Sequence, residues 1–174
     1  MIIMPATVRQ MKMIKPLYLS AFPRNERKPF WLIKKKVSEG KMKIMAIEEE
    51  GFAGLAILML YKDIVLLDYF AISPSRRDEG LGSEALKILR DMFSERRLFL
   101  EIELPDGGEN DYIKERRKAF YLRNGLVETG FKASVFGVPM EMLTFGSIIS
   151  MDDYFGIYRY VLGSFLASKV RPLE

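Results

Sequence analysis

The chain has 174 residues, of which 49% are hydrophobic and 29% charged, and its formal net charge is +4. This length and composition predict one globular domain, and so small an excess of positive charge does not indicate a nucleic-acid partner. Because the sequence contains neither cysteine nor histidine, it excludes disulfides, thiolate and histidine metal sites, a cysteine nucleophile and a Ser-His-Asp triad, so acid–base chemistry must use carboxylates, tyrosine, lysine or water.

The first half of the chain predicts two helices followed by three strands. Apolar residues at helical spacing mark the helices, and runs rich in β-branched and aromatic residues mark the strands. Since only tight turns separate the strands, they are expected to be antiparallel. The expected elements are helices over 7–20 and 30–39, and strands over 41–49, 52–61 and 64–72.

The second half mixes helices and strands. A strand, a helix and a further strand in succession imply a parallel pair, which predicts an α+β fold with a mixed, mostly antiparallel central sheet flanked by helices. The expected elements are a helix over 83–93, a strand over 98–104, a helix over 111–124, a closing hairpin of 131–138 and 140–145, and a final helix opening at Ser150.

The C-terminal segment is expected to form a helical extension at about 150–170 of a single domain spanning 1–174. The sequence Ser150-Met-Asp-Asp153 is similar to a capping box, with Asp in place of the usual Glu or Gln. The helix that follows should pack on the core rather than form an interface. Its apolar stripe consists of Tyr154, Tyr158, Val161 and Phe165.

A glycine-containing loop joins the strand at 64–72 to the helix at 83–93. Its Arg77-x-x-Gly80-x-Gly82 pattern places small residues before a helix N-terminus, where free backbone N–H groups and the helix dipole favour an anion. Arg76 and Arg77 add charged donors. Neither the Walker A pattern nor the dinucleotide fingerprint is present. The alternative is an ordinary helix start with flexible glycines and solvated arginines.

Two segments resemble the GCN5-related N-acetyltransferase family. Arg77-Asp-Glu-Gly80-Leu-Gly82 matches its Arg/Gln-x-x-Gly-x-Gly/Ala motif, and the preceding residues 68–74 look like its fourth strand. Residues 117–126, Arg-Lys-Ala-Phe-Tyr-Leu-Arg-Asn-Gly-Leu, resemble its second block, a helix carrying Phe-Tyr-x-x-x-Gly-Phe. The segment 21–27 is similar to the acceptor-side loop of some bacterial members. The resemblance covers roughly residues 5–145.

The resemblance implies acetyl-CoA as co-substrate, and no metal. Acetyl-CoA would enter where the sheet splays between its fourth and fifth strands. In the family, pantetheine pairs with the fourth strand, which here implicates the backbone around Phe70 and Ile72. The pyrophosphate would lie on backbone N–H groups of the glycine loop. The residues of that loop are Arg77, Asp78, Glu79, Gly80, Leu81, Gly82 and Ser83.

Candidate catalytic residues come from the resemblance and from the strand pattern. Tyr121 matches the family tyrosine that protonates the departing thiolate, and a phenol with a pKa of about 10 is protonated at neutral pH. The proton acceptor for the amine would be Asp68, at a family position near the acceptor, or Glu101 or Glu103, which share one face of a strand. The alternatives are an ordinary packed tyrosine and solvent-facing or salt-bridged carboxylates.

The resemblance therefore implies an N-acetyltransferase in which a primary amine attacks acetyl-CoA directly, with a small-molecule amine favoured. Alternatives are a protein Nα or lysine acetyltransferase and a non-catalytic CoA-binding module. We expect a monomer or homodimer with no nucleic-acid partner. Residues 1–10 do not resemble a signal peptide, and the longest apolar run, 52–61, is too short for a membrane span of about 20 residues. A cytoplasmic protein without a membrane partner is expected.

Overall fold

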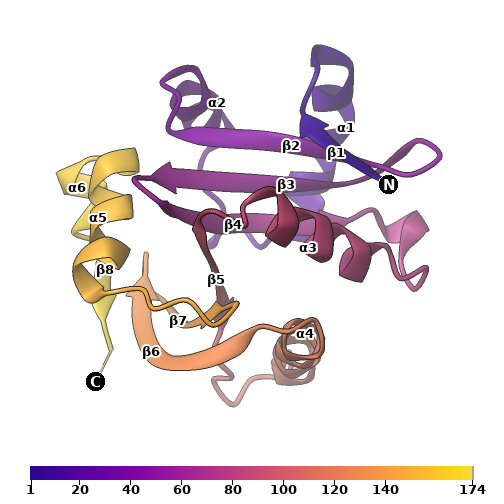
Figure 1. The fold of residues 1–174 in the computed structure, drawn as a ribbon. Coiled ribbons are helices and arrows are strands. Elements are labelled where there is room, and N and C mark those ends of the chain that lie inside the picture. Colours follow the sequence, from indigo (N-terminus) through magenta and orange to yellow (C-terminus); the bar gives the residue numbers. More distant parts are fainter. Residues whose placement is uncertain (174) are drawn as a thin grey trace.

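The computed structural model describes residues 1–173, which form one eight-stranded sheet with helices on both faces (Figure 1). The strand order is β1-β2-β3-β4-β5-β7-β6-β8, and every neighbouring pair is antiparallel except β4 and β5. This confirms the expected mixed, mostly antiparallel sheet. The strands are β1 (Ile2–Pro5), β2 (Met42–Glu48), β3 (Phe52–Tyr61), β4 (Ile64–Ile72), β5 (Arg97–Glu103), β6 (Val127–Val135), β7 (Val138–Thr144) and β8 (Val170–Pro172).

The helices divide between the two faces of the sheet, because each buries one apolar stripe. The core on one face includes residues of α1, α2, α5 and α6, and the core on the other includes residues of α3 and α4. Strand β3 lies between both cores, which explains its continuous apolar sequence. The helices are α1 (Val8–Ala21), α2 (Phe30–Ser38), the 3₁₀ turn η1 (Pro74–Arg76), α3 (Leu81–Met92), α4 (Asp111–Arg123), α5 (Met151–Leu162) and α6 (Ser164–Ala167).

The parallel strands β4 and β5 separate part-way along their length. They pair only from Ile64 opposite Arg97 to Leu67 opposite Leu100. The next residue of β4, Asp68, is a bulge, because its neighbours on β4 pair with consecutive residues of β3. A bulge bends and twists a strand. The expected splay between the fourth and fifth strands is therefore confirmed, and it begins at Asp68.

The sequence missed the two edge strands and misplaced one turn. Strand β1 ends at Pro5 and β8 has only three residues, so neither carries a recognisable strand pattern. The expected hairpin of 131–138 and 140–145 turns earlier, at Phe136 and Gly137, whose φ angles are 51° and 89°. Positive φ at both central residues is the geometry of a type I′ turn. The non-glycine Phe136 hid this signal.

The C-terminal segment packs on the sheet as part of the core. Helix α5 begins where expected, with the N–H of Asp153 donating to Ser150 Oγ over 3.1 Å, and Tyr154 and Tyr158 of the expected stripe are buried. Phe165 does not continue the stripe and is 77% exposed, because Gly163, with φ of 85°, ends the helix. None of the described helices is long and apolar enough to cross a membrane.

Candidate active site

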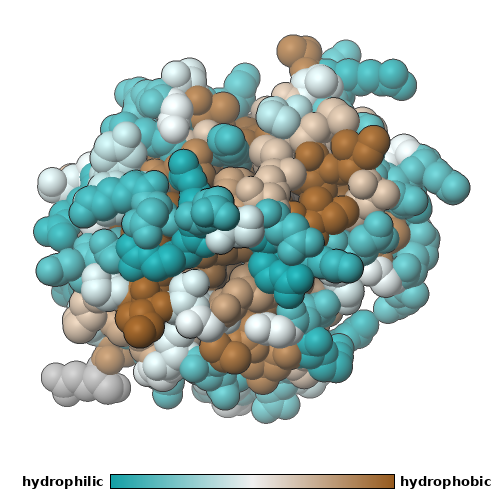
Figure 2. Space-filling view, in the orientation of Figure 1, coloured by the Kyte–Doolittle hydropathy of each residue, from teal (hydrophilic) through white to brown (hydrophobic). Residues whose placement is uncertain are grey.

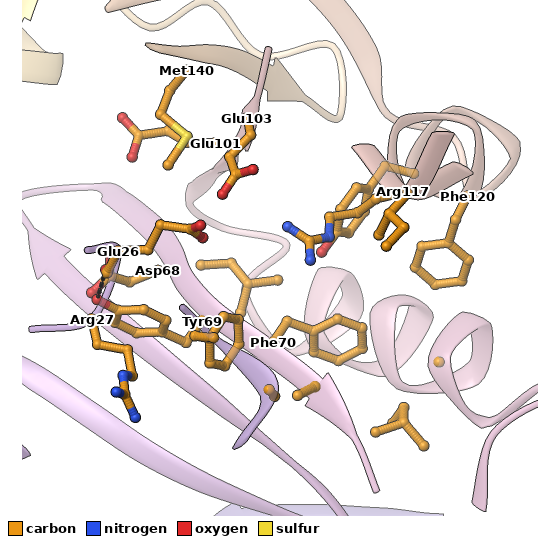
Figure 3. Close-up of a pocket in the computed structure, with 18 of the residues that line it drawn as sticks. Glu26, Arg27, Asp68, Tyr69, Phe70, Glu101, Glu103, Arg117, Phe120 and Met140 are labelled. Carbon is orange, nitrogen blue, oxygen red and sulfur yellow. Dashed lines mark hydrogen bonds between the residues drawn. The ribbon is translucent and has the colours of Figure 1, made fainter. Parts of the chain in front are cut away.

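A cleft of about 770 Å³ opens where β4 and β5 part. Its walls are the glycine loop, α4, the segment between α1 and α2, and the β6–β7 hairpin. Figure 3 shows some of its lining residues. On the molecular face drawn in Figure 2, apolar side chains form separate patches divided by polar ones. The cleft brings together most residues predicted from the sequence: Asp68, Phe70, Ile72, Arg77, Asp78, Gly80, Leu81, Gly82, Ser83, Glu101 and Tyr121.

Glu79 is the predicted loop residue that does not line the cleft. Its carboxylate accepts a 2.9 Å hydrogen bond from Arg76 Nε, and Arg76 Nη1 also donates to the carbonyl oxygen of Glu49 over 2.8 Å. Arg76 thereby ties the loop to the turn after β2. Both Asp78 and Gly80 have positive φ angles, of 64° and 78°. The loop thus enters α3 through a sharp turn, and a glycine at residue 80 adopts the required positive φ without a steric cost.

The glycine loop presents free backbone donors. Within the described chain, the N–H groups of residues 78–82 donate no hydrogen bond, since the first bonds into α3 come from Ser83 and Glu84 to the carbonyl oxygen of Gly80. A row of free N–H groups at a helix N-terminus suits phosphate. Arg77 on the loop and Arg116 and Arg117 on α4 also line the cleft. The arrangement fits the pyrophosphate of a CoA-type ligand.

Gly82 lies where α3 and α4 approach each other closely. A Cβ added to this residue would stand 3.1 Å from Cζ of Phe120 and 3.7 Å from Cγ1 of Ile72. Such a contact is tighter than ordinary van der Waals packing. Gly82 therefore sets the spacing between the loop and the helix that carries Tyr121, in addition to leaving backbone open to a ligand.

Gly82→Val should weaken acetyl-CoA binding and also lower the free energy of unfolding by about 1–3 kcal/mol, because the added methyl groups press on Phe120. Calorimetric titration and urea unfolding would measure the two effects. In the Phe120→Ala background the ring is absent, so Gly82→Val should cost less stability than in the wild type. An equal cost in both backgrounds would show that the Phe120 contact is not the cause.

Tyr121 lines the cleft as a largely buried side chain. The residue is 8% exposed, and its hydroxyl makes no hydrogen bond to any described residue. Burial raises the pKa of Tyr121 to about 12, against a smaller lowering by Arg117. The phenol therefore keeps its proton throughout the neutral range. A protonated, unpartnered donor inside a cleft is placed to serve a bound molecule.

Asp68, the residue at the bulge, is paired within the cleft. Lys28 Nζ binds both of its carboxylate oxygens, at 2.7 and 2.9 Å. The side chains are only 5% exposed for Asp68 and 8% for Lys28. Both carboxylate oxygens are thus already engaged by a cationic side chain of the same cleft.

Glu101 is held by the C-terminal helix. Tyr154 and Tyr158 of α5 donate one hydrogen bond to each of its carboxyl oxygens, that from Tyr158 at 2.5 Å. Burial raises the pKa of Glu101, while the two tyrosine hydrogen bonds partly offset that rise. With both oxygens engaged, Glu101 joins β5 to α5. The tyrosine stripe found in the sequence therefore supports the floor of the cleft.

Glu103 lies two residues further along β5, and its side chain points toward that of Glu26 across the cleft (Figure 3). Glu26 was not among the residues singled out from the sequence. The signal for it was the resemblance of segment 21–27 to an acceptor-side loop, which names a region but not a side chain. A pair separated by 76 intervening residues becomes visible only in the folded chain.

Two buried tyrosines fix the loop that carries Glu26. The hydroxyl of Tyr69 on β4 donates to the carbonyl oxygen of Glu26 and accepts the N–H of Lys28, both over 2.9 Å. The hydroxyl of Tyr18 on α1 donates to the carbonyl oxygen of Lys28 over 2.8 Å. The backbone on both sides of Arg27 is therefore anchored, which sets the position of Glu26 relative to β5.

No known family model matches the chain, and no curated protein matches it. Its structure resembles that of a Bacteroides thetaiotaomicron protein assigned to the GNAT family of acetyltransferases, with 23% identity, a TM-score of 0.78, and coverage of 94% of this chain and 99% of that one. It also resembles an aminoglycoside 6′-N-acetyltransferase complexed with coenzyme A, with 15% identity, a TM-score of 0.65, and coverage of 86% and 100%.

A third similar structure is a spermidine N-acetyltransferase from Vibrio cholerae in complex with CoA and spermine, with 13% identity, a TM-score of 0.64, and coverage of 82% of this chain and 93% of that one. At identities this low, the likeness concerns the arrangement of the chain. Combined with the splayed β4 and β5 and the glycine loop before α3, it leads to one conclusion: the chain has the fold of the GNAT acetyltransferases.

Proposed function

We propose that this protein is an acetyl-CoA-dependent N-acetyltransferase that acts on a primary amine. The observation that carries the proposal is the content of one cleft: free N–H groups of the glycine loop, an unpaired edge of β4 and the protonated hydroxyl of Tyr121. These features suit, in turn, a pyrophosphate, an extended pantetheine arm and a leaving thiolate. The similar structures with bound CoA add support.

The residues of the cleft fit acetyl-CoA. The N–H groups of residues 78–82 and the side chain of Arg77 would hold the pyrophosphate, and the β4 edge around Phe70 and Ile72 would accept the pantetheine arm through backbone hydrogen bonds. When bound, acetyl-CoA supplies an activated acetyl group as a thioester. Backbone N–H groups at that edge would polarise its carbonyl.

Transfer would be direct, from thioester to amine. The chain has no cysteine to form an acyl-enzyme. Tyr121 would donate its proton to the sulfur atom as the C–S bond breaks, because a phenol with a pKa of about 12 still holds its proton at neutral pH. Asp68 and Glu101 are candidate bases by position, but each is engaged by partners of its own.

The acceptor would be a small molecule. The part of the cleft beyond β4 and β5 is walled by the α1–α2 segment, the β6–β7 hairpin, and Leu162 and Leu166 near the C-terminus. Walls on these three sides suit a compact amine better than a peptide chain, which needs a groove that runs across the surface. Two of the similar structures are an aminoglycoside acetyltransferase and a spermidine acetyltransferase.

Acetyl-CoA at 100 times its Kd should raise the free energy of unfolding by about 2.7 kcal/mol, because it binds the folded chain alone. A thermal-shift series with acetyl-CoA, CoA and acetyl-pantetheine would measure the effect. Acetyl-pantetheine lacks the pyrophosphate, so it should shift the melting temperature far less. If millimolar acetyl-CoA leaves the melting temperature unchanged, the chain does not bind this co-substrate and the proposed function is wrong.

A further inference from the structure

A pair of carboxyl groups lies at the acceptor end of the cleft. Glu26, on the segment between α1 and α2, and Glu103, at the end of β5, both line the cleft and point toward each other (Figure 3). Burial and the neighbouring carboxyl group of Glu103 both raise the pKa of Glu26. Two facing carboxyl groups can hydrogen-bond to each other only if one of them keeps a proton, since two ionised carboxylates offer only acceptors. A pair placed in this way can therefore hold one proton between its members.

Several cationic side chains lie near the Glu26–Glu103 pair, and they differ in whether they already have a carboxylate partner. Burial, reinforced by Glu103, raises the pKa of Glu26 to about 8, while Arg117 and Lys114 of α4 lower it in part. Lys114 is also bound to Asp106 at 3.0 Å, and the charge of Lys28 is matched by that of Asp68. Arg27 Nη1 donates to the carbonyl oxygen of Leu19. Arg117 and Arg27 are thus nearby cations for which the structure shows no carboxylate partner among the described residues.

We propose that the Glu26–Glu103 pair, held in register by Tyr69, is the proton acceptor that deprotonates the substrate amine. The inference deepens the proposed function and rests on it. Among the carboxylates of the cleft, Asp68 is occupied by Lys28, and Glu101 is occupied by Tyr154 and Tyr158. Arg117 and Lys114 lie near Glu26, but no described side chain forms a salt bridge with either Glu26 or Glu103, so a substrate ammonium can replace the proton between them.

The proton balance follows from this arrangement. A protonated amine docks between the carboxylates, its positive charge displaces the shared proton to solvent, and the pair then takes one proton from nitrogen. The free nitrogen lone pair forms a bond to the thioester carbon, and the C–S bond breaks as Tyr121 donates its proton to sulfur. The second proton lost from nitrogen restores Tyr121, directly or through water. The products are an N-acetylated amine and CoA thiol. The pair has regained the single proton of its resting state, and the one net proton released is the one displaced to solvent on docking.

Two carboxylates suit this role better than one. An isolated carboxyl group with a pKa of about 4.3 is a weak base toward an alkylammonium group with a pKa of about 10. The sharing of a proton brings the pair closer to the amine in basicity, which favours the transfer. The hydroxyl of Tyr69 holds the backbone of Glu26 at 2.9 Å and makes no contact with the reacting atoms. Tyr69 is therefore a positioning residue.

The shared proton can be tested without any substrate. Protein labelled with ¹³C at the glutamate carboxyl carbons should show one resonance titrating near pH 8, absent from Glu26→Gln and shifted down by about one pH unit or more in Glu103→Gln. The resonance of Glu101 should stay in place in both variants and serve as a reference. If Glu26 titrates below pH 6 in the wild type, the two carboxyl groups share no proton and the inference is wrong.

Catalysis is the second test. With saturating acetyl-CoA and the best acceptor from a panel of polyamines, aromatic amines and peptides, kcat/KM should rise with pH through about 8. In each of the variants Glu26→Gln and Glu103→Gln, this rise of kcat/KM with pH should disappear. Their kcat should fall about 10²-fold, while the KM for acetyl-CoA stays unchanged. Glu115→Gln, on the exposed part of α4, is the matched control and should behave as wild type.

The possible outcomes distinguish this inference from the proposed acetyltransferase activity on which it rests. If the wild type is active and its Glu26 and Glu103 variants keep both kcat and the rise of kcat/KM with pH, the inference is wrong. The proposed acetyltransferase function would still stand. A wild type that binds acetyl-CoA but acetylates no amine would overturn the proposed function and the inference together. Tyr69→Phe should lower kcat and make the rise of kcat/KM with pH less steep, because the carbonyl oxygen of Glu26 loses the hydrogen bond from the Tyr69 hydroxyl.

Discussion

Replacing Tyr121 by phenylalanine should lower kcat about 10²–10⁴-fold, the usual value of a general acid. The substitution removes one hydroxyl group and keeps the ring, which packs against Phe120 with centroids 5.2 Å apart. Because the hydroxyl has no hydrogen-bond partner in the described chain, its removal leaves no buried group unsatisfied. The fold and the KM for acetyl-CoA should therefore change little.

The measurement is the rate of thiol release from acetyl-CoA with a saturating amine, together with the melting temperature. Tyr112→Phe provides the matched control, since Tyr112 lies on the same helix but is 67% exposed and outside the cleft. A Tyr121→Phe variant with near-normal kcat would mean that this tyrosine only packs. A variant that loses kcat and stability together would point to a structural role.

Asp68→Asn should lower the free energy of unfolding by about 3–5 kcal/mol, because it leaves the ammonium of Lys28 buried without its partner. Urea unfolding would measure the loss. The double variant with Lys28→Met removes both charges and should recover much of that stability. The same cost with and without Lys28 would show that the ion pair is not what Asp68 contributes.

The same variant also separates two interpretations of Asp68. If Asp68 were the base, Asp68→Asn would lose activity chiefly at low pH, where the amine is most protonated, and would keep its stability. If Asp68 holds Lys28 in the cleft wall, stability falls first and the pH profile keeps its shape. The paired oxygens at 2.7 and 2.9 Å from Lys28 favour the second result.

Elements with strong local signals were predicted correctly from the sequence. The apolar run of β3, the β-branched run of β4 and the amphipathic α3 were found within two residues of their bounds. The edge strands β1 and β8 carry no such pattern, and their pairing depends on neighbours far along the chain. The turn at Phe136 was missed because its positive φ belongs to a residue that seldom adopts it.

The two halves of the site differ in the same way. The cofactor half is built from consecutive residues, since a loop and the helix it opens carry their own motif, and all of its predicted residues except Glu79 line the cleft. The proposed acceptor half is built from residues distant in sequence: Lys28 with Asp68, Glu26 with Glu103, and Glu101 with Tyr154 and Tyr158. Only the tertiary fold determines which of these carboxylates are bound to a partner side chain and which remain available to a substrate.

The most direct test of the account is acetyl transfer itself. Purified protein, acetyl-CoA and the amine panel would be followed by free thiol and by the mass of the acetylated amine, with Tyr121→Phe in parallel. We expect thiol release that depends on the amine, yields an acetylated small molecule and falls about 10²-fold or more in the variant. Tight acetyl-CoA binding with no acetylated product from any amine or peptide would contradict an acetyltransferase and favour a CoA-binding module.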